Sequence, residues 1–293
     1  MSDAVICAYA RTPFGKFRGA LSSYSATDLG TLAVKGLLER IGIDPSSGII
    51  DQLYMGNVLQ AGVGQAPARQ VALSSGLPFS TPCTTINKVC GSSLKAAMIG
   101  ATEIMAGRAN VIIAGGMESM SNAPHFIRSA RRGVEISYAD LDSVLSHDGL
   151  KDAYDDSMMG ITGETIADEA GISRAVSDEY ALRSHTLANK AWNEGWFSEE
   201  CILIDELDRD EGIRPNTTAE GLAGLRTVFK EDGQVTAGNA SQVSDGASAI
   251  LIASREVATN NGWPILARIT DFTTSGVEPH RVMSAPIPAI ESL

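Results

Sequence analysis

Cys90 lies in a stretch whose residue types suit nucleophilic chemistry. An apolar-to-polar run over 84–89 leads into it, and a helical pattern over 92–106 follows. This order predicts that Cys90 lies where a strand turns into a helix, with Gly91 permitting a tight bend. The first N–H groups of a helix would stabilise a thiolate and receive the oxyanion formed when sulfur attacks a thioester. The alternative is a buried, inert cysteine, because free cysteines are among the most buried residues.

The length, composition and charge of the chain limit the kinds of ligand and partner that it can bind. The chain has 293 residues, 44% hydrophobic and 20% charged, with a formal net charge of −12. Length alone suggests two domains of about 150 residues each. Such an acidic chain is a poor match for a nucleic-acid backbone, although an acidic nucleotide could bind a local basic pocket. With no apolar run near ~20 residues and no signal peptide, we expect no membrane span and no secretion.

The spacing of the four cysteines indicates neither a metal site nor a set of disulfides. Cys7, Cys83, Cys90 and Cys201 form no C-x-x-C pair, and no nearby histidine gives zinc-ligand spacing. We therefore expect reduced thiols in a cytoplasmic protein without a metal site.

Hydrophobic periodicity indicates the elements that must position Cys90. Apolar runs predict strands, at 5–9, 52–59, 84–89, 111–114, 249–253 and 265–269. Helical spacing predicts helices, at 25–41 with Ser25 or Thr27 as cap, 65–75, 92–106, 177–194 and 255–261. Because strand and helix alternate over the first ~120 residues, we expect a mostly parallel α/β sheet with helices on both faces.

The pattern changes near residue 121. From there to 242 strands are scarce, and an acidic segment over 140–156 reads as solvated surface. In the helix over 177–194, the spacing places four apolar residues on one face, namely Tyr180, Leu187, Ala191 and Trp192. This region is too long and too apolar to be a linker, so we expect an insertion between halves of an α/β unit.

Four stretches, taken in order, resemble the thiolase family of acetyl-CoA acetyltransferases and 3-ketoacyl-CoA thiolases. They are Arg11-Thr12-Pro13-Phe14-Gly15, the segment 87–92, the segment 114–121, and 236–241 with Asp245-Gly246-Ala247. The resemblance runs along the whole chain and implies a layered α/β/α fold with an inserted, mainly helical loop domain. It implies an N-terminal domain of 1–120 and 243–268, a CoA-binding loop domain of 121–242, and the start of a C-terminal domain at 269–293.

The resemblance also implies the chemistry. Cys90 would carry an acyl group in a ping-pong reaction of lipid metabolism, either condensing two acetyl-CoA or cleaving a 3-ketoacyl-CoA with CoA. CoA would be a substrate, with no tightly bound cofactor. Arg214 would pair with its nucleotide end, and small residues would admit the pantetheine arm. The family's CoA-lining positions correspond to Leu150, Met159, Arg214, Ala237, Ala240 and Ser241.

Each of these residues also has a plainer interpretation. Arg214 alone is more often a surface charge, and Ala237-Gly238 alone is a turn. Gly115-Gly116 could serve strand-end packing without touching a ligand. The order of the motifs along the chain is what favours the site.

Two departures from the family pattern matter. Met158 stands where several acetoacetyl-type members have histidine, and Gly221 replaces a serine that contacts CoA in some members. Family members also continue for roughly another hundred residues, an ordinary domain's length. Those residues carry an Asn-Glu-Ala-Phe stretch, the Gly-His-Pro histidine that activates the nucleophile, and a second, acid–base cysteine. This sequence has none of them, and its histidines stand in other contexts, at His125, His147, His185 and His280.

The missing motifs bear on activity. Each lost acid–base partner costs ~10²–10⁴-fold, so we expect this chain alone to be nearly inactive. A rival interpretation is a non-catalytic thiolase-like subunit or fragment for CoA binding or assembly, and a weaker one is a ketoacyl synthase acting on a carrier protein. The resemblance further implies a homodimer or homotetramer, with a second chain as a possible source of the missing half.

Overall fold

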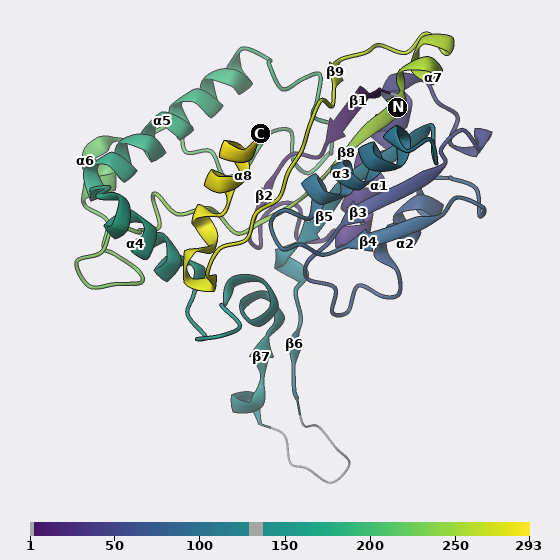
Figure 1. Ribbon diagram of the computed structural model, residues 1–293. Coiled ribbons are helices and arrows are strands. Elements are labelled where there is room, and N and C mark those ends of the chain that lie inside the picture. Colours follow the sequence, from purple (N-terminus) through teal and green to yellow (C-terminus); the bar gives the residue numbers. More distant parts are fainter. Residues whose placement is uncertain (1–2, 129–136) are drawn as a thin grey trace.

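A mixed sheet of seven strands forms the centre of the computed structural model, which describes residues 3–128 and 137–293 (Figure 1). Its strands are β1 (Ala4–Arg11), β2 (Gly15–Lys16), β3 (Gln52–Gly56), β4 (Cys83–Ile86), β5 (Val111–Ser119), β8 (Ser244–Ser254) and β9 (Ala267–Arg268). The order across the sheet is β4-β3-β5-β8-β1-β9, and β2 pairs with β8. All six predicted strands are present, although the last shrinks to two residues.

Strand direction is only partly as predicted. β3 runs parallel to β4 and β5, but β8 is antiparallel to β5 and β1, and β9 is antiparallel to β1. The register gives the reason, because Ser119 at the end of β5 pairs with Asp245 at the start of β8. The chain between them leaves and re-enters the sheet at the same edge, so β8 must run back along β5.

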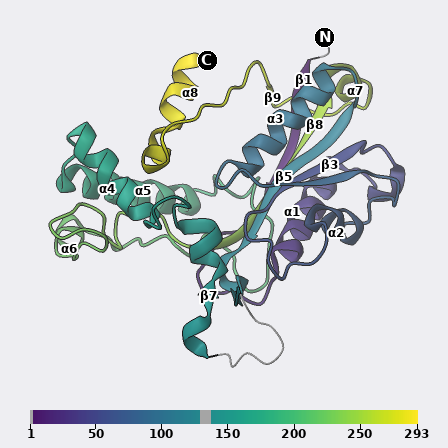
Figure 2. The ribbon, with the colours of Figure 1, turned by 60° about the horizontal axis from the view of Figure 1, so that its bottom comes forward.

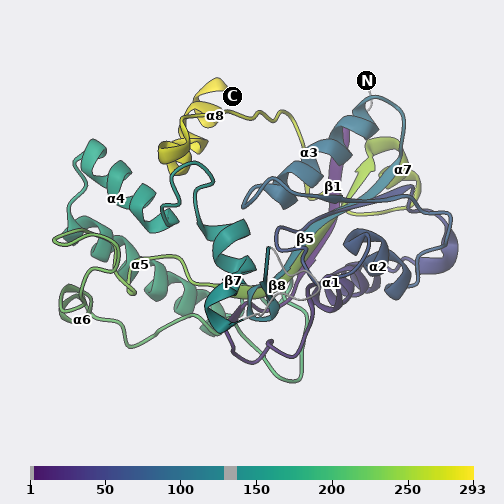
Figure 3. The ribbon, with the colours of Figure 1, turned by 90° about the horizontal axis from the view of Figure 1, so that it is seen from below.

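Helices cover both faces of the sheet, as predicted. Helices α1 (Ala26–Ile41) and α2 (Pro67–Ser74) lie on one face, and α3 (Ser92–Met105) lies on the other (Figures 2 and 3). Neighbouring strand residues alternate between the two cores. On β3, Leu53 packs with α1 and α2, whereas Tyr54 packs with α3. This alternation explains why the strand sequences are apolar at successive positions.

The predicted cap of α1 is confirmed. The Ser25 Oγ accepts from the Asp28 N–H at 3.1 Å, and the Asp28 carboxylate accepts from the Ser25 N–H at 3.0 Å. Such a reciprocal box contributes about 1 kcal/mol. The helix ends at Gly42, whose φ of 71° lies in the left-handed region that glycine adopts readily.

The described part of 121–242 contributes no strand to the main sheet. It holds the small pair β6 (His125–Phe126) and β7 (Asp142–Ser143), the π-helical turn η4 (Leu145–Leu150), and helices α4 (Met159–Ala170), α5 (Arg174–Asn193) and α6 (Ala219–Ala223). These helices form a separate group beside the sheet (Figure 1). The predicted scarcity of strands is confirmed, while the exact domain bounds stay a prediction.

The remaining helical pieces are short. They are the 3-10 turns η1 (Pro45–Ser47), η2 (Met120–Asn122), η3 (Tyr138–Asp140) and η5 (Pro279–Ser284), and the helices α7 (Arg255–Asn260) and α8 (Pro286–Ser292). Arg281 of η5 pairs with Glu169 of α4 at 2.8 Å, so the end of the chain packs on the inserted region. Across the described residues, every helix is too short or too polar to cross a bilayer.

Three expectations for the inserted region were wrong. Helix α5 begins at Arg174, three residues early, because the Ser173 Oγ accepts from the Val176 N–H and caps it there. Its buried face holds Asp178, Ala181 and Ala191, whereas Tyr180 is 70% exposed. Small residues on the inner face let α5 pack closely. Asp152, expected on a solvated surface, is buried and accepts from the Tyr154 N–H at 2.7 Å.

Arg11, at the end of β1, ties the inserted region to the sheet. Its guanidinium donates to both oxygens of Asp210 at 2.7 and 3.2 Å, and to Glu200 at 2.7 Å. The rings of Phe14 and Phe197 lie 5.1 Å from it. Only 11% of the Arg11 side chain and 15% of the Asp210 side chain are exposed. We call these five residues the Arg11 cluster.

The Arg11 cluster generates a stability prediction. Arg11→Ala leaves the Asp210 carboxylate buried without its cation, so we expect the free energy of unfolding to fall by ~3–5 kcal/mol in urea titrations. The loss of stability in Arg11→Lys should lie between zero and the loss in Arg11→Ala, because lysine keeps the charge but cannot donate two parallel hydrogen bonds to Asp210. The control is Arg255→Ala, whose pair with Asp3 is 46% and 42% exposed and should cost ~1 kcal/mol or less. Equal losses for Arg11→Ala and the control would contradict the role given to the cluster.

Candidate functional site

Cys90 lies on a short turn between β4 and α3, as predicted. Strand β4 ends at Ile86, and α3 begins at Ser92 with Gly91 as its N-cap. The thiol is exposed, whereas Cys7 and Cys201 are buried and Cys83 is half-buried. Burial raises the pKa of the Cys7 and Cys201 thiols to about 11, and it raises that of Cys83 as well. Of the four cysteines, Cys90 alone is open to a reagent or substrate.

The bend in this turn is at Val89, and the expectation that Gly91 supplies it was wrong. Gly91 has an ordinary φ of −89°, whereas Val89 has a φ of 46°. A left-handed conformation is rare for a β-branched residue, and such strain gathers at functional sites. The Asn87 Oδ1 accepts from the Val89 N–H at 3.0 Å, and the Ser92 Oγ accepts from the Lys88 N–H at 2.8 Å. These bonds hold the strained turn closed.

Some of the amides at this helix start are already engaged. The Gly91 N–H donates to the Lys88 carbonyl and the Ser92 N–H to the Val89 carbonyl, each at 3.1 Å. An oxyanion formed at Cys90 would therefore have to find other donors, or compete with these two bonds.

Two glycines allow α3 to start where it does. Gly56 on β3 and Gly116 on β5 are register partners. A Cβ at Gly56 would lie 2.7 Å from the Ser92 Cβ, and one at Gly116 would lie 2.8 Å from the Ser93 Cβ. The first turn of α3 thus rests on the main chain of both strands. The contact with Ser93 explains why residue 116 is a glycine, as the interpretation of Gly115-Gly116 as packing residues predicts.

Glu118 is a part of this edge that the sequence analysis missed. Its carboxylate accepts from the Val58 and Leu59 N–H groups at 2.9 and 3.1 Å and from the Asn57 Nδ2 at 2.9 Å. Burial raises its pKa, against the two backbone bonds that lower it. The Val58 carbonyl in turn accepts from the Asn87 Nδ2 at 3.4 Å. A charged residue among the small and apolar residues that end β5 was the signal available in the sequence.

Two of the predicted CoA residues, Leu150 and Met159, lie opposite each other. Lys151 and Met158 form an isolated antiparallel bridge. In such a bridge the residue before one partner lies opposite the residue after the other, which places Leu150 opposite Met159. Gly160 follows at the start of α4 and packs against the ring of Phe229. Phe229 belongs to a hairpin closed by the bridge between Thr227 and Thr236. The contact of Gly160 with Phe229 therefore places the start of α4 beside the hairpin from which the loop 236–241 continues.

The loop 236–241 presents three of the other predicted residues outward. Thr236 is fully buried, while Ala237, Ala240 and Ser241 are exposed. Gly238 between them lies against Leu222 and Leu225, where a Cβ would come within 2.5 Å of both side chains.

Arg214 lies on a neighbouring segment. Its side chain is exposed, and its N–H donates to the His185 Nδ1 of α5 at 3.2 Å. Gly212 packs against the side chain of Gln242, which brings this segment beside Ser241. The inserted region therefore links the start of α4 to the loop 236–241 through Phe229, and it links the Arg214 segment to the end of that loop through Gln242.

The histidines are engaged away from Cys90 or exposed. His147 bonds through Nδ1 to Asp148 at 2.6 Å, and His185 accepts from Arg214. His125 and His280 are exposed, on β6 and η5. These contacts agree with the expectation that the four histidines serve surface or polar packing.

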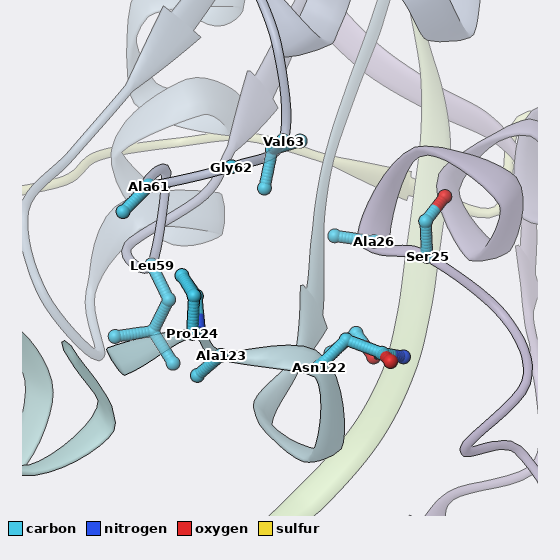
Figure 4. A pocket seen from close by; sticks show the side chains of 10 residues that line it. Ser25, Ala26, Leu59, Ala61, Gly62, Val63, Asn122, Ala123 and Pro124 are labelled. Atoms are coloured by element: carbon cyan, nitrogen blue, oxygen red, sulfur yellow. The ribbon is translucent and has the colours of Figure 1, made fainter. Parts of the chain in front are cut away.

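A cavity of about 190 Å³ lies near the same edge of the sheet but includes none of the seven predicted residues. Figure 4 shows its mainly apolar wall between the start of α1, the loop after β3 and the chain that leaves β5. It is lined by Ser25, Ala26, Leu59, Ala61, Gly62, Val63, Ser119, Asn122, Ala123 and Pro124.

Comparisons with known proteins agree with this architecture. The family profile for the N-terminal domain of thiolase matches residues 4–256. A probable acetyl-CoA acetyltransferase of Escherichia coli is 44% identical over 295 residues, covering 98% of this chain and 75% of that protein. An acetyl-CoA acetyltransferase of Pseudomonas aeruginosa is 43% identical over 298 residues, covering 99% of this chain and 75% of that protein.

Solved structures give the same answer. Human mitochondrial 3-ketoacyl-CoA thiolase in complex with CoA superposes with a TM-score of 0.94 at 38% identity, covering 99% of this chain and 74% of that one. The Acat5 thiolase of Ascaris suum in complex with coenzyme A superposes with a TM-score of 0.91 at 37% identity, covering 99% and 76%. The chain thus spans about three-quarters of these relatives' length. It has the thiolase fold and belongs to the thiolase family.

Proposed function

We propose that this chain is the acyl-carrying part of an acyl-CoA C-acyltransferase, with Cys90 as nucleophile. The observation that supports this most is the exposed thiol on a strained turn at the start of α3, at the edge where the parallel strands end. Ligand sites of α/β sheets gather at that edge. The relatives named above include acetyltransferases and structures that hold CoA.

The proposed first half-reaction moves an acyl group onto sulfur. The Cys90 thiolate attacks the thioester carbonyl, the carbon–sulfur bond to CoA breaks, and CoA leaves as a thiolate that takes up a proton. In the cleaving direction the Cys90 thiolate attacks the 3-keto carbonyl of a 3-ketoacyl-CoA, the C2–C3 bond breaks, and acetyl-CoA leaves as a carbanion that takes up a proton. A CoA thiolate then attacks the acyl-enzyme and frees Cys90. In the condensing direction a second acetyl-CoA loses a methyl proton and its carbon displaces the sulfur. This sequence carries no motif for the group that would take that proton.

CoA would bind across the inserted region. We infer that Arg214 faces the acidic nucleotide end, that Leu150 and Met159 contact its apolar parts, and that the pantetheine arm lies along Ala237, Ala240 and Ser241. The exposure of the last three supports this path, since an arm beside exposed small residues meets little but backbone. CoA acts as a substrate here, with no resident cofactor.

The rival proposal is a thiolase-like subunit that binds CoA or assembles without turning over. Turnover needs acid–base groups, and these 293 residues carry neither a Gly-His-Pro motif nor a second-cysteine motif. For either proposal we infer a homodimer or homotetramer. Four free thiols support a reducing compartment such as the cytoplasm.

Acylation tests the nucleophile. On incubation with acetyl-CoA, tryptic mass spectrometry should find the acetyl adduct on Cys90 and no adduct in Cys90→Ser. Cys83→Ser is the matched control, because this half-buried thiol should be dispensable. An adduct that persists in Cys90→Ser, or that sits on Cys83 in the native protein, would remove Cys90 from its proposed role.

Turnover separates the two proposals. We expect the 293-residue chain to cleave acetoacetyl-CoA with CoA at least ~10²-fold more slowly than an intact thiolase, because it lacks acid–base partners. The assay follows loss of the enolate absorbance. Turnover close to that of an intact enzyme would eliminate the non-catalytic subunit and show that the missing motifs are dispensable.

His185 generates a pH prediction, because it accepts from the Arg214 N–H only while its Nδ1 is unprotonated. Burial, then the charge of Arg214, lowers the pKa of His185 below its ordinary value. The unfolded chain therefore takes up a proton first, near pH 6.5, and stability falls as pH falls from there through the lower folded pKa. Above that range the contribution is complete.

The measurement is Tm at pH 7 and pH 5. Native protein should lose more Tm over this range than His185→Gln, which offers an acceptor that does not titrate. His125→Gln, a change at an exposed histidine, serves as control and should lose as much Tm as the native protein. The idea fails if His185→Gln and native protein lose the same Tm.

A further inference from the structure

Buried carboxylates hold the loop 236–241 from its inner side. Asp178 of α5 is 6% exposed, and its Oδ1 accepts from the Asn239 Nδ2 at 2.9 Å. The same Nδ2 donates to the Gln234 carbonyl at 2.8 Å, while the Asn239 Oδ1 accepts from the Thr236 N–H at 2.8 Å. One side chain thus closes the loop on itself and ties it to α5.

Glu164 of α4 holds the segment 234–235 that enters the loop. It is 2% exposed, and its two oxygens accept from the Gln234 and Val235 N–H groups at 2.7 and 2.8 Å. Gly233 lies against the same carboxylate, where any Cβ would meet its oxygens. Two helices that are separate in sequence therefore fix the two halves of one loop.

Arg174 extends the network to α6. Its Nε donates to the Asp178 Oδ2 at 2.8 Å, and its Nη2 donates to the carbonyls of Leu222 and Leu225 at 2.6 and 3.1 Å. Those two leucines form the floor against which Gly238 packs. Asp178 is thereby joined to the loop both through Asn239 and through the surface beneath Gly238.

The polar groups of this network point inward while the loop's small residues point outward. A buried carboxylate fixes two donors at once, and bonds to a charged group are stronger than neutral ones. The outward position of Ala237, Ala240 and Ser241 thus depends on groups that no ligand need touch. We propose that Asp178 and Glu164 are positioning residues, which set the loop's shape and through it the affinity for CoA. This inference rests on the proposed function.

The test combines backbone exchange with CoA affinity in the full chain. Asp178→Ala should raise hydrogen exchange in peptides covering 234–242 about tenfold, and the Kd for CoA from calorimetry about tenfold, as expected for one lost charged hydrogen bond. Glu164→Ala should do the same for the 233–236 amides. The control is Glu194→Ala at the C-cap of α5, where the exposed i,i+4 pair of Glu194 with Lys190 spans 3.8 Å.

A rescue separates positioning from mere folding. Asn239→Asp places two carboxylates together and should raise the Kd. Adding Asp178→Asn restores a donor between them and keeps an acceptor for Arg174, while the Gln234 carbonyl still lacks the donor that Asn239 gave it. The double variant should therefore recover part of the lost affinity. A purely structural role would change Tm in these variants and leave the Kd of the folded protein for CoA unchanged.

Each outcome decides between the possibilities. The proposal is overturned if Asp178→Ala matches Glu194→Ala in both exchange and Kd, or if Kd fails to recover in the double variant. If the native chain does not bind CoA, the CoA part of the proposed function fails. The exchange data then decide alone whether Asp178 and Glu164 position the loop: unchanged exchange rejects it, and raised exchange supports it.

Discussion

The start of α3 rests on the main chain of β3 and β5, and the place of Cys90 follows from that contact. Gly56 and Gly116 are register partners on neighbouring strands, and a side chain at either position would clash with Ser92 or Ser93 of α3. The helix cannot shift toward the sheet, and the chain has only residues 87–91 in which to turn from β4 into α3. Val89 then takes a left-handed conformation that costs on the order of 1–3 kcal/mol. The packing of a helix on a sheet thus fixes a strained turn that carries an exposed thiol.

Buried or half-buried carboxylates fix three of the loops, as the two glycines fix the start of α3. Glu118 holds the loop after β3, Glu164 holds the entry to 236–241, and Asp245 accepts from the Ser121 N–H at 2.9 Å. An ionised carboxylate has only acceptors, so it suits a loop whose N–H groups have no strand partner. Part of the net charge of −12 therefore has an internal, structural use.

The sequence was a good guide where one local signal decided the structure. The strands, the α3 boundary and the Ser25 cap depend on residues close in sequence, and each was predicted. The bend at Val89 was not, because valine disfavours that conformation and only the packing of α3 imposes it. The start of α5 was missed because Ser173 and Ser177 are equally good caps by composition.

Contacts that span many residues had no signal of this kind. Asp178 reaches Asn239 across 61 residues and Glu164 reaches Gln234 across 70. Periodicity cannot pair such positions, since it reports only which face of an element is buried. The resemblance named the outward residues of the loop, and the structure adds the inward ones.

One short segment ties Arg214, a predicted CoA residue, to the end of β1 and to β2. Asp210 accepts from the Phe14 N–H at 2.8 Å, and Glu211 accepts from the Lys16 N–H at 3.0 Å, so 210–211 is bound to the chain just after β1. Gly212 then packs on Gln242, and Arg214 follows two residues later. A region joined this closely does not behave as a freely hinged domain. The Arg11 cluster, by holding Asp210, therefore bears on where Arg214 lies as well as on how stably the chain folds.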